Sequence, residues 1–181
     1  MIYFTSDLHF CHNKEFIYEA RGFDTVQEMN EVIVKNWNEQ VDTEDEVYCL
    51  GDLMLCDNEE GARLLHQLNG HIHIVLGNHD TSSRIEIYKN SYNVVEVEYG
   101  LPFRYNGYHF FLSHYPTITS NFDNEKPLKL QCINLCGHSH TFDPFENWDL
   151  GNIYHVELDA HNNKPISIDE IIQDIVKKRL K

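Results

Sequence analysis

Five short apolar runs in this chain are each followed by residues of the types that can bind metal ions or carry protons. The runs are Ile2–Thr5, Val47–Leu50, Ile72–Leu76, Phe110–Ser113 and Ile133–Cys136. Runs of this length and composition predict buried strands. Because ligand sites of open α/β sheets lie beyond the carboxyl ends of the strands, the polar residues after these runs are expected to meet in one crevice.

Helical patterns lie between the first of these runs. Thr25 and Glu28 form a capping box, and the apolar stripe that follows predicts a helix near residues 26–40. A second helix is predicted over residues 57–70, and a third follows Thr81. Strands and helices that alternate in this way favour a mainly parallel or mixed α/β sheet in the first half of the chain.

The second half of the chain has a different pattern. Tyr105-Asn106-Gly107-Tyr108 is the strongest short signal for a β-hairpin, and a further strand is predicted across Ile153–Leu158. Ser167 and Glu170 form another capping box, which opens a C-terminal helix. Two sheets covered by helices would accommodate both halves. Since no repeat, low-complexity tract or linker divides the sequence, residues 1–181 are expected to form a single domain.

The charge balance is strongly acidic. The 181 residues include 14 Lys+Arg and 29 Asp+Glu, which gives a formal net charge of -15. This charge repels nucleic acids and anionic membranes, so strong non-specific nucleic-acid binding is not expected. No apolar run approaches the ~20 residues of a membrane-spanning helix, and the N-terminus lacks the basic start of a signal peptide. We therefore expect a soluble, cytoplasmic protein.

The cysteines predict free thiols in a reducing compartment. Their number is odd, they are scattered along the chain, and no pair has the spacing C-x-x-C. They are Cys11, Cys49, Cys56, Cys132 and Cys136.

The polar residues after the apolar runs are of metal-ligand type. They form the blocks Asp7-x-His9, Gly51-Asp52, Gly77-Asn78-His79-Asp80, His114 and Gly137-His138-Ser139-His140. The glycines permit tight turns that aim the next side chain over a sheet edge. Each residue alone has an alternative interpretation as an ordinary core or surface polar group, and His114 would serve equally well as a strand-end histidine. Their joint occurrence favours one site.

Seven groups form the predicted ligand set. They are Asp7, His9, Asp52, Asn78, His114, His138 and His140. Seven ligands exceed the coordination sphere of one tetrahedral ion and suit two ions ~3.5–4 Å apart that share a bridging ligand. An imidazole and oxygen set without thiolate favours manganese, iron, cobalt, nickel or zinc over magnesium or calcium.

The order and form of these blocks resemble the calcineurin-like metallophosphoesterases, in particular their small bacterial and phage members. The resemblance implies an α/β fold, a four-layer α/β/β/α sandwich of two mixed β-sheets flanked by helices. It also implies two divalent transition-metal ions, with manganese the first expectation, and a bridging hydroxide that attacks phosphorus. The implied ligands are Asp7, His9 and His140 for one ion, Asn78, His114 and His138 for the other, and Asp52 as the bridge.

The resemblance assigns His79 and Asp80 to catalysis, with His79 facing the leaving group and Asp80 orienting it. A positioned imidazole that protonates the leaving group contributes ~10²–10⁴-fold to the rate. Substrate contacts are expected from Asn78, from His12 and from Arg21, the last as a bidentate phosphate clamp. The alternatives for His12 and Arg21 are a surface loop histidine and a surface ion pair.

Further residues of the predicted strands are expected to be structural. The aromatic residues Tyr3, Phe4, Phe110 and Phe111 are predicted to be core rather than a base-stacking platform, and His71 and His73 are predicted to face solvent.

We expect a phosphoesterase that cleaves small phosphodiesters, cyclic or nucleotide-derived esters among them. After Gly51-Asp52 the chain lacks the arginine of Ser/Thr protein phosphatases and the tyrosine of purple acid phosphatases. Dianionic monoesters gain most from an additional cationic side chain such as this arginine. The alternatives are a phosphomonoesterase, a nuclease and a non-catalytic binding scaffold of the same fold. A nuclease would need a basic track, for which the sequence offers only Lys177-Lys178-Arg179, and a scaffold would tolerate ligand loss, whereas no ligand is missing.

Overall fold

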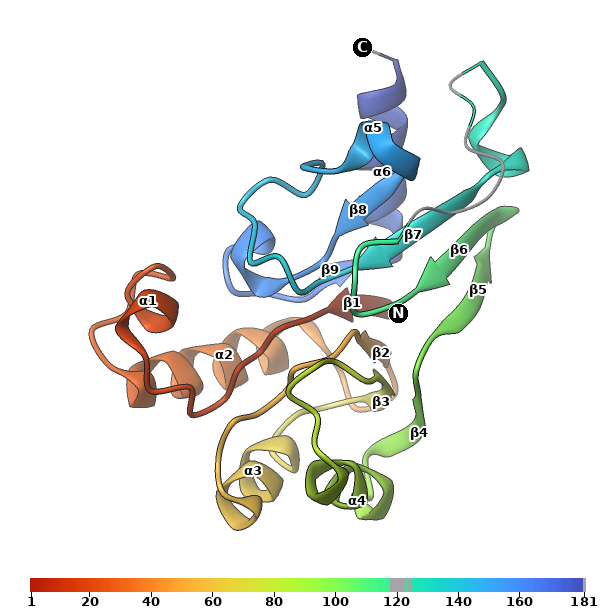
Figure 1. Cartoon of the computed structure of the whole chain (residues 1–181). Helices are drawn as coiled ribbons and strands as arrows, with labels where there is room; N and C mark the ends of the chain where they lie inside the picture. Colours follow the sequence, from red (N-terminus) through yellow and green to blue (C-terminus); the bar gives the residue numbers. More distant parts are fainter. Residues whose placement is uncertain (118–122, 124, 181) are drawn as a thin grey trace.

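Two β-sheets lie face to face between two groups of helices (Figure 1). The computed structural model describes residues 1–117, 123 and 125–180. Within these residues the strands are β1 (Ile2–Thr5), β2 (Glu46–Cys49), β3 (His71–Val75), β4 (Val94–Glu98), β5 (Leu101–Tyr105), β6 (Tyr108–Leu112), β7 (Cys132–Cys136), β8 (Ile153–His155) and β9 (Ile166–Ser167). The α-helices are α1 (Glu15–Tyr18), α2 (Val26–Gln40), α3 (Asn58–Leu65), α4 (Ser82–Asn90), α5 (Trp148–Gly151) and α6 (Ile168–Arg179).

Both sheets are mixed. The first has the strand order β4-β3-β2-β1-β9, in which β1 to β4 run parallel and β9 runs antiparallel to β1. The second has the order β5-β6-β7-β8, in which β5 is antiparallel to β6 and the other pairs are parallel. The predicted α/β/β/α sandwich is confirmed, and so is the hairpin at Asn106 and Gly107, which joins β5 to β6.

The first sheet is buried on both faces. Tyr3 packs into the core that the sheet shares with α2 and α3, whereas its neighbour Phe4 packs into the core shared with the second sheet and α6. This follows from the strand itself, since successive side chains point to opposite faces. Phe110 is buried in the second of these cores, whereas Phe111 is only partly buried and belongs to neither, so the prediction of a core role is confirmed for Tyr3, Phe4 and Phe110.

Both predicted helix starts are capped, but only the capping box at Ser167 is complete, since the Glu28 carboxylate accepts from the backbone N–H of Asp24 instead of that of Thr25. Thr25 Oγ1 accepts a hydrogen bond from the backbone N–H of Glu28 at 3.2 Å and begins α2. Ser167 begins α6 with a reciprocal capping box, in which its side chain and that of Glu170 each bond the other's backbone.

The helix predicted over residues 57–70 ends earlier, at Leu65. The side-chain amide of Asn93 donates to the carbonyl groups of Leu65 and Leu68, at 2.9 and 3.1 Å. These tertiary hydrogen bonds end the helix before Gly70, which has a φ of 92°.

The expectation of five free thiols is wrong for one pair. Cys11 and Cys56 form a disulfide, with their Cα atoms 5.1 Å apart. The two cysteines are 45 residues apart in sequence, but the loops after β1 and β2 run side by side and Phe10 pairs with Met54. Cys49 and Cys136 are buried thiols, as expected.

The expectation that His73 faces solvent is also wrong. His71 is exposed, but the His73 ring is buried between two carboxylates, with its nitrogens 2.6 Å from Glu46 and from Glu96. These carboxylates come from β2 and β4, on either side of β3, and Tyr48 stacks on the ring at 4.4 Å. Every helix among the described residues is too short or too polar to span a membrane.

Replacing Ser167 by alanine should lower the free energy of unfolding by about 1 kcal/mol, because α6 would lose the side-chain acceptor for its first turn. Thr81→Ala is the matched control, since Thr81 begins α4 without a side-chain capping bond. Urea unfolding followed by circular dichroism measures both variants. Equal destabilisation by the two substitutions would contradict the capping role of Ser167.

Candidate metal centre

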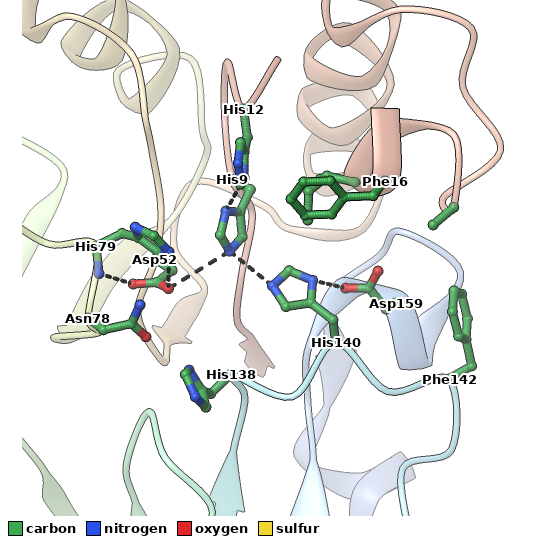
Figure 2. A pocket seen from close by; sticks show the side chains of 12 residues that line it. His9, His12, Phe16, Asp52, Asn78, His79, His138, His140, Phe142 and Asp159 are labelled. Carbon is green, nitrogen blue, oxygen red and sulfur yellow. Dashed lines mark hydrogen bonds and ion pairs between the residues drawn. The ribbon is translucent and has the colours of Figure 1, made fainter. Parts of the chain in front are cut away.

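The predicted ligands converge where the carboxyl ends of strands from both sheets meet. Asp7, Asp52 and Asn78 follow β1, β2 and β3 of the first sheet, whereas His114 and His138 follow β6 and β7 of the second. His9 and His140 lie two residues beyond Asp7 and His138. Figure 2 shows these loops facing one another around a common opening. The sandwich thus supplies the ligands from two separate sheets.

The backbone at five of the predicted ligands is in the left-handed region, which non-glycine residues rarely adopt. The φ angles are 56° at Asp7, 52° at His9, 54° at Asp52, 74° at His138 and 50° at His140. Each such residue costs of order 1–3 kcal/mol and persists only where the surrounding structure imposes it. The concentration of unfavourable backbone at this edge is typical of a functional site.

Two glycines allow the loops to approach closely. A Cβ atom on Gly137 would lie 1.9 Å from Ser6 Oγ and 2.2 Å from Asp7 Oδ2, and one on Gly77 would lie 2.2 Å from Asp52 Oδ1. These glycines therefore leave room for the carboxylates of the neighbouring loop. Gly51, which precedes Asp52, has a positive φ of 98°, a conformation that favours glycine; Gly77 and Gly137 do not have a positive φ.

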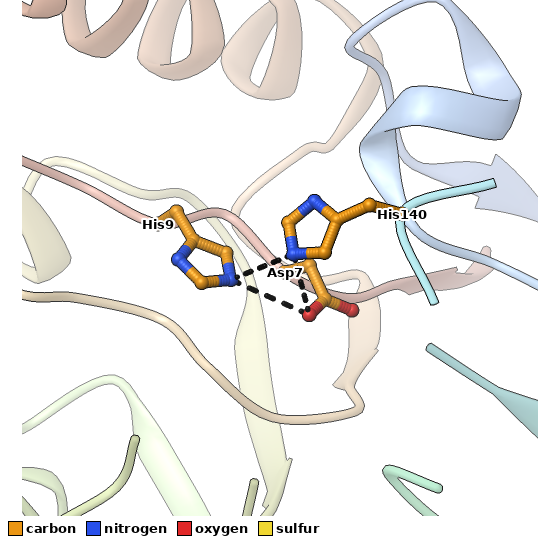
Figure 3. A group of neighbouring side chains, drawn as sticks. All are labelled: Asp7, His9 and His140. Atoms are coloured by element: carbon orange, nitrogen blue, oxygen red, sulfur yellow. Dashed lines mark hydrogen bonds and ion pairs between the residues drawn. The ribbon is translucent and has the colours of Figure 1, made fainter. Parts of the chain in front are cut away.

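One group of possible ligands consists of Asp7, His9 and His140 (Figure 3). Asp7 Oδ1 lies 3.5 Å from His9 Nε2 and 3.6 Å from His140 Nε2, and the two imidazole nitrogens are 3.1 Å apart. Three donor atoms of different side chains are therefore directed at one small volume.

A second group consists of Asp7, Asp52 and His114. His114 Nε2 is 3.4 Å from Asp52 Oδ2, 3.0 Å from Asn78 Oδ1 and 3.2 Å from His138 Nδ1. The structure thus brings all seven predicted ligands together.

Asp52, a member of the second group, also lies close to a histidine of the first. Its Oδ2 is 3.8 Å from His9 Nε2, in the first group, and 3.4 Å from His114 Nε2, in the second. Its Oδ1 accepts a hydrogen bond from the backbone N–H of His79 at 2.8 Å. Asp7 belongs to both groups as well.

The hydrogen bonds of these side chains are compatible with cation binding. His114 Nδ1 donates to the carbonyl of Leu50 at 2.8 Å, so a neutral ring directs the lone pair of Nε2 into the cluster. Asp7 Oδ1 is buried and has no hydrogen-bond partner among the described residues. A carboxylate oxygen in that situation, beside imidazole nitrogens, is suited to a metal ion.

The electrostatics of the cluster keep its carboxylates ionised. Burial opposes the charge of Asp7, but the nearby imidazoles of His9, His114 and His140 outweigh it and lower the pKa of Asp7. Burial likewise disfavours a charged His114, yet Asp52 and Asp7 raise its pKa to about 9. The imidazoles thus lower the pKa of Asp7, the carboxylates raise the pKa of His114, and a divalent cation would compete with the proton on His114 for the same atoms.

Asp159 is a residue of the site that the strand-end pattern does not reveal. It lies in the short 3-10 helix Leu158–His161, and its Oδ2 is 3.2 Å from His140 Nδ1. Burial raises the pKa of Asp159, but His140 and Arg21 outweigh this and lower it to about 2. A carboxylate at Nδ1 orients the ring so that Nε2 faces the cluster.

Arg21 does not lie where a phosphate clamp would be needed. Its buried guanidinium forms a bidentate pair with Asp159, at 2.7 and 3.1 Å, and donates to the carbonyl groups of Asp7 and Leu8. The side chain instead fixes the loop after β1 relative to Asp159. The surface ion-pair alternative is also wrong, since the pair is buried.

Asp80 is likewise placed differently from the expectation. Its Oδ2 accepts from the backbone N–H groups of Asp52 and Gly77 at 3.0 and 2.7 Å, and its Oδ1 accepts from the Tyr88 hydroxyl at 2.7 Å. In the described part of the chain no hydrogen bond joins this carboxylate to the His79 imidazole. Asp80 therefore holds the two loops that carry Asp52 and Asn78.

His79 and His12 border the opening of the site. The His79 side chain is 42% exposed, and its Nε2 lies 4.0 Å from Asp52 Oδ2. His12 stacks on His9, with Nδ1 atoms 2.9 Å apart. A cavity of about 570 Å³ opens over the cluster, lined by His9, His12, Phe16, Ile17, Ala20, Asp52, Asn78, His79, His138, His140, Phe142 and Asp159.

Comparison with known proteins agrees with this geometry. An uncharacterized protein of Methanocaldococcus jannaschii, MJ1445, is 37% identical over 185 residues, which cover 99% of this chain and 93% of that protein. The crystal structure of AQ665 from Aquifex aeolicus, a protein of unknown function, is similar with a TM-score of 0.70 and 26% identity, over 96% of this chain and 98% of that one. The calcineurin-like phosphoesterase superfamily domain matches residues 1–156, a range that contains all seven predicted ligands. This chain belongs to the calcineurin-like phosphoesterase superfamily.

Proposed function

We propose that this protein is a dinuclear metal-dependent phosphoesterase that hydrolyses small phosphodiesters. The observation that supports this most directly is the position of Asp52 Oδ2 between His9 Nε2 and His114 Nε2, at 3.8 and 3.4 Å. A carboxylate between two sets of donor atoms is suited to bridging two ions, as in other two-metal hydrolases.

The assignment of residues to two ions starts from the two groups and adds Asn78 and His138, which lie 3.0 and 3.2 Å from His114 Nε2. Asp7, His9 and His140 would hold one ion, Asn78, His114 and His138 would hold the other, and Asp52 would bridge them. Once bound, divalent ions supply the positive charge that phosphoryl oxygens need and acidify a water molecule. Nitrogen and oxygen donors without thiolate suit manganese, which we propose as the ion most readily used.

His79 is proposed as the residue that protonates the leaving group. Its half-exposed ring borders the cavity beside Asp52 and Asn78, so a substrate oxygen can reach it. The imidazolium would give its proton to the departing alkoxide, which is a poor leaving group without it. The backbone of His79 is fixed by its hydrogen bond to Asp52 Oδ1, which keeps the ring at the cavity edge.

The preference for diesters rests on the charges around the cavity. Neither lysine nor arginine is among the described residues that line it, and the guanidinium of Arg21 is paired with Asp159. A phosphomonoester dianion would therefore find no additional cationic clamp, whereas a diester carries one negative charge fewer. The acidic net charge of -15 gives no support to binding of long nucleic acids.

Elemental analysis of protein saturated with Mn²⁺ should find close to two ions per chain, because two groups of donors share the centre. Treatment with a chelator should abolish hydrolysis, and added Mn²⁺ should restore it. A folded sample that holds at most one ion at saturation would exclude the dinuclear centre.

The enzyme should cleave bis-p-nitrophenyl phosphate with a higher kcat/KM than p-nitrophenyl phosphate or a single-stranded oligonucleotide, by about tenfold or more. The three substrates are compared with one metal and at one salt concentration. Preference for the monoester would indicate a phosphomonoesterase, and preference for the oligonucleotide a nuclease; either would overturn the proposed diesterase.

His79→Ala should retain both ions and lose about 10²–10⁴-fold in kcat on a diester with an alkoxide leaving group. The loss on bis-p-nitrophenyl phosphate should be much smaller, because nitrophenolate departs without protonation. Ser139→Ala, at an exposed loop position between His138 and His140, is the control and should behave as the wild type. Equal losses on the two diesters would exclude His79 as the acid.

A further inference from the structure

Two phenylalanines with large exposed side chains border the cavity. Phe16 is 71% exposed and Phe142 is 64% exposed, although both are apolar residues next to a cluster of charged groups. Phe16 lies in α1, and Phe142 lies in the loop that begins at His140. Their exposure leaves apolar surface uncovered at a site where a ligand is expected.

These aromatic side chains occupy one side of the opening. Figure 2 shows Phe16 and Phe142 on the side of His140 and Asp159, whereas Asn78 and His79 lie on the other side. The aliphatic side chains of Ile17 and Ala20, also from the segment at α1, line the same cavity. We call these four residues, Phe16, Ile17, Ala20 and Phe142, the apolar wall.

Phe16 is held in place by the rings that lead to the metal centre. It packs edge-on against His12 with ring centroids 5.9 Å apart, and His12 stacks on His9 at 5.0 Å. The aromatic surface is therefore continuous with a predicted metal ligand. A group bound to phosphorus at the centre would extend over this surface.

The chemistry of the cavity restricts the group that the wall would contact. Among the described lining residues the charged or ionisable groups are histidines and aspartates, so a second phosphate on the ligand would face no lysine or arginine. The volume of about 570 Å³ lies in the ordinary range for sites that hold a molecule of nucleotide size. Uncharged, flat and apolar groups fit these conditions best.

We propose that the apolar wall binds a planar aromatic group of the substrate, either a nucleobase or an aryl group, so that the preferred esters are phosphodiesters with one phosphorus atom and an aromatic substituent. This inference rests on the proposed phosphodiesterase activity. Phe16 and Phe142 are the specificity-determining residues, and aromatic surface of this kind contributes through stacking and burial of apolar area.

A binding experiment tests the wall without the reaction. Saturation-transfer NMR on chelator-treated protein is recorded with adenosine, with benzyl alcohol and with ribose. Wild-type protein should transfer saturation to the rings of adenosine and benzyl alcohol but not to ribose, and the double variant Phe16→Ala, Phe142→Ala should lose both signals. Transfer to adenosine alone would identify the group as a nucleobase. If neither ring receives saturation, or if transfer is undiminished in the double variant, the proposal is overturned.

Tyr99→Ala is the matched control in this experiment. Tyr99 is 81% exposed and does not line the cavity, so its removal takes away comparable aromatic surface elsewhere. The control should bind both rings like the wild type. Loss of binding in this variant as well would mean that the signals come from non-specific contacts, and would also overturn the proposal.

Kinetics of the Mn²⁺-loaded enzyme separate this inference from the proposed function. The double variant should raise KM for bis-p-nitrophenyl phosphate by about fivefold or more and leave KM for glycerophosphocholine unchanged. If KM rises equally for both diesters, the proposed role of the apolar wall is overturned, whereas the proposed phosphodiesterase activity is retained. If the protein binds the rings through Phe16 and Phe142 but hydrolyses neither diester, the proposed phosphodiesterase activity is overturned. The proposed binding role of the apolar wall is then retained.

Discussion

The buried carboxylate of Asp7 is the group on which the arrangement of this protein depends. Its Oδ2 accepts a hydrogen bond from the backbone of His138 at 2.8 Å, which links the loop after β1 to the loop after β7 in the other sheet. Its Oδ1 points at imidazoles from both sheets. A buried charge of this kind is strongly unfavourable unless it is paired, and the histidines of both sheets provide the pairing. The carboxylate of Asp7 therefore contributes both to the site and to the contact between the two sheets.

Several residues outside the ligand set hold these loops at the required spacing. Asp80 accepts from the backbone of both Asp52 and Gly77, and so ties the loops after β2 and β3 together. Arg21 plays the same part between the loop after β1 and Asp159. Such contacts hold the ligands in rare backbone conformations that the loops alone would not adopt. Preorganisation of this kind lowers the energy needed to assemble a metal centre when ions bind.

The pairing of charged side chains within the protein also determines which groups line the cavity. Arg21 is paired with Asp159 and Arg84 donates to the backbone carbonyl of His79, and neither arginine is among the described residues that line the cavity. Around the cavity, Asn78 and His79 lie on one side, and the apolar wall lies on the other side together with His140 and Asp159. The proposed enzyme would recognise the phosphoryl group through bound metal and the organic substituent through apolar contact. Its acidic surface is compatible with this, because small esters are not excluded by the long-range field as polyanions are.

Local sequence determined much of this protein. Apolar runs of four or five residues followed by His or Asp predict both the strands and the ligands, because the run requires burial and the strand end fixes where the next side chain lies. The helix caps at Thr25 and Ser167 are equally local, since each side-chain acceptor and its backbone donor are three residues apart. Sequence therefore suffices where the cause lies within a few residues.

Only the tertiary structure decided the contacts between distant segments. The disulfide of Cys11 and Cys56 depends on two loops lying side by side, and the pairing of Arg21 with Asp159 joins residues 138 positions apart. Asp159 follows no strand-end pattern, and Phe142 resembles any loop residue until its side chain is placed at the cavity. The physical reason is the same in each case: a charge, thiol or ring acquires its role from partners that only the packing of the two sheets brings within reach.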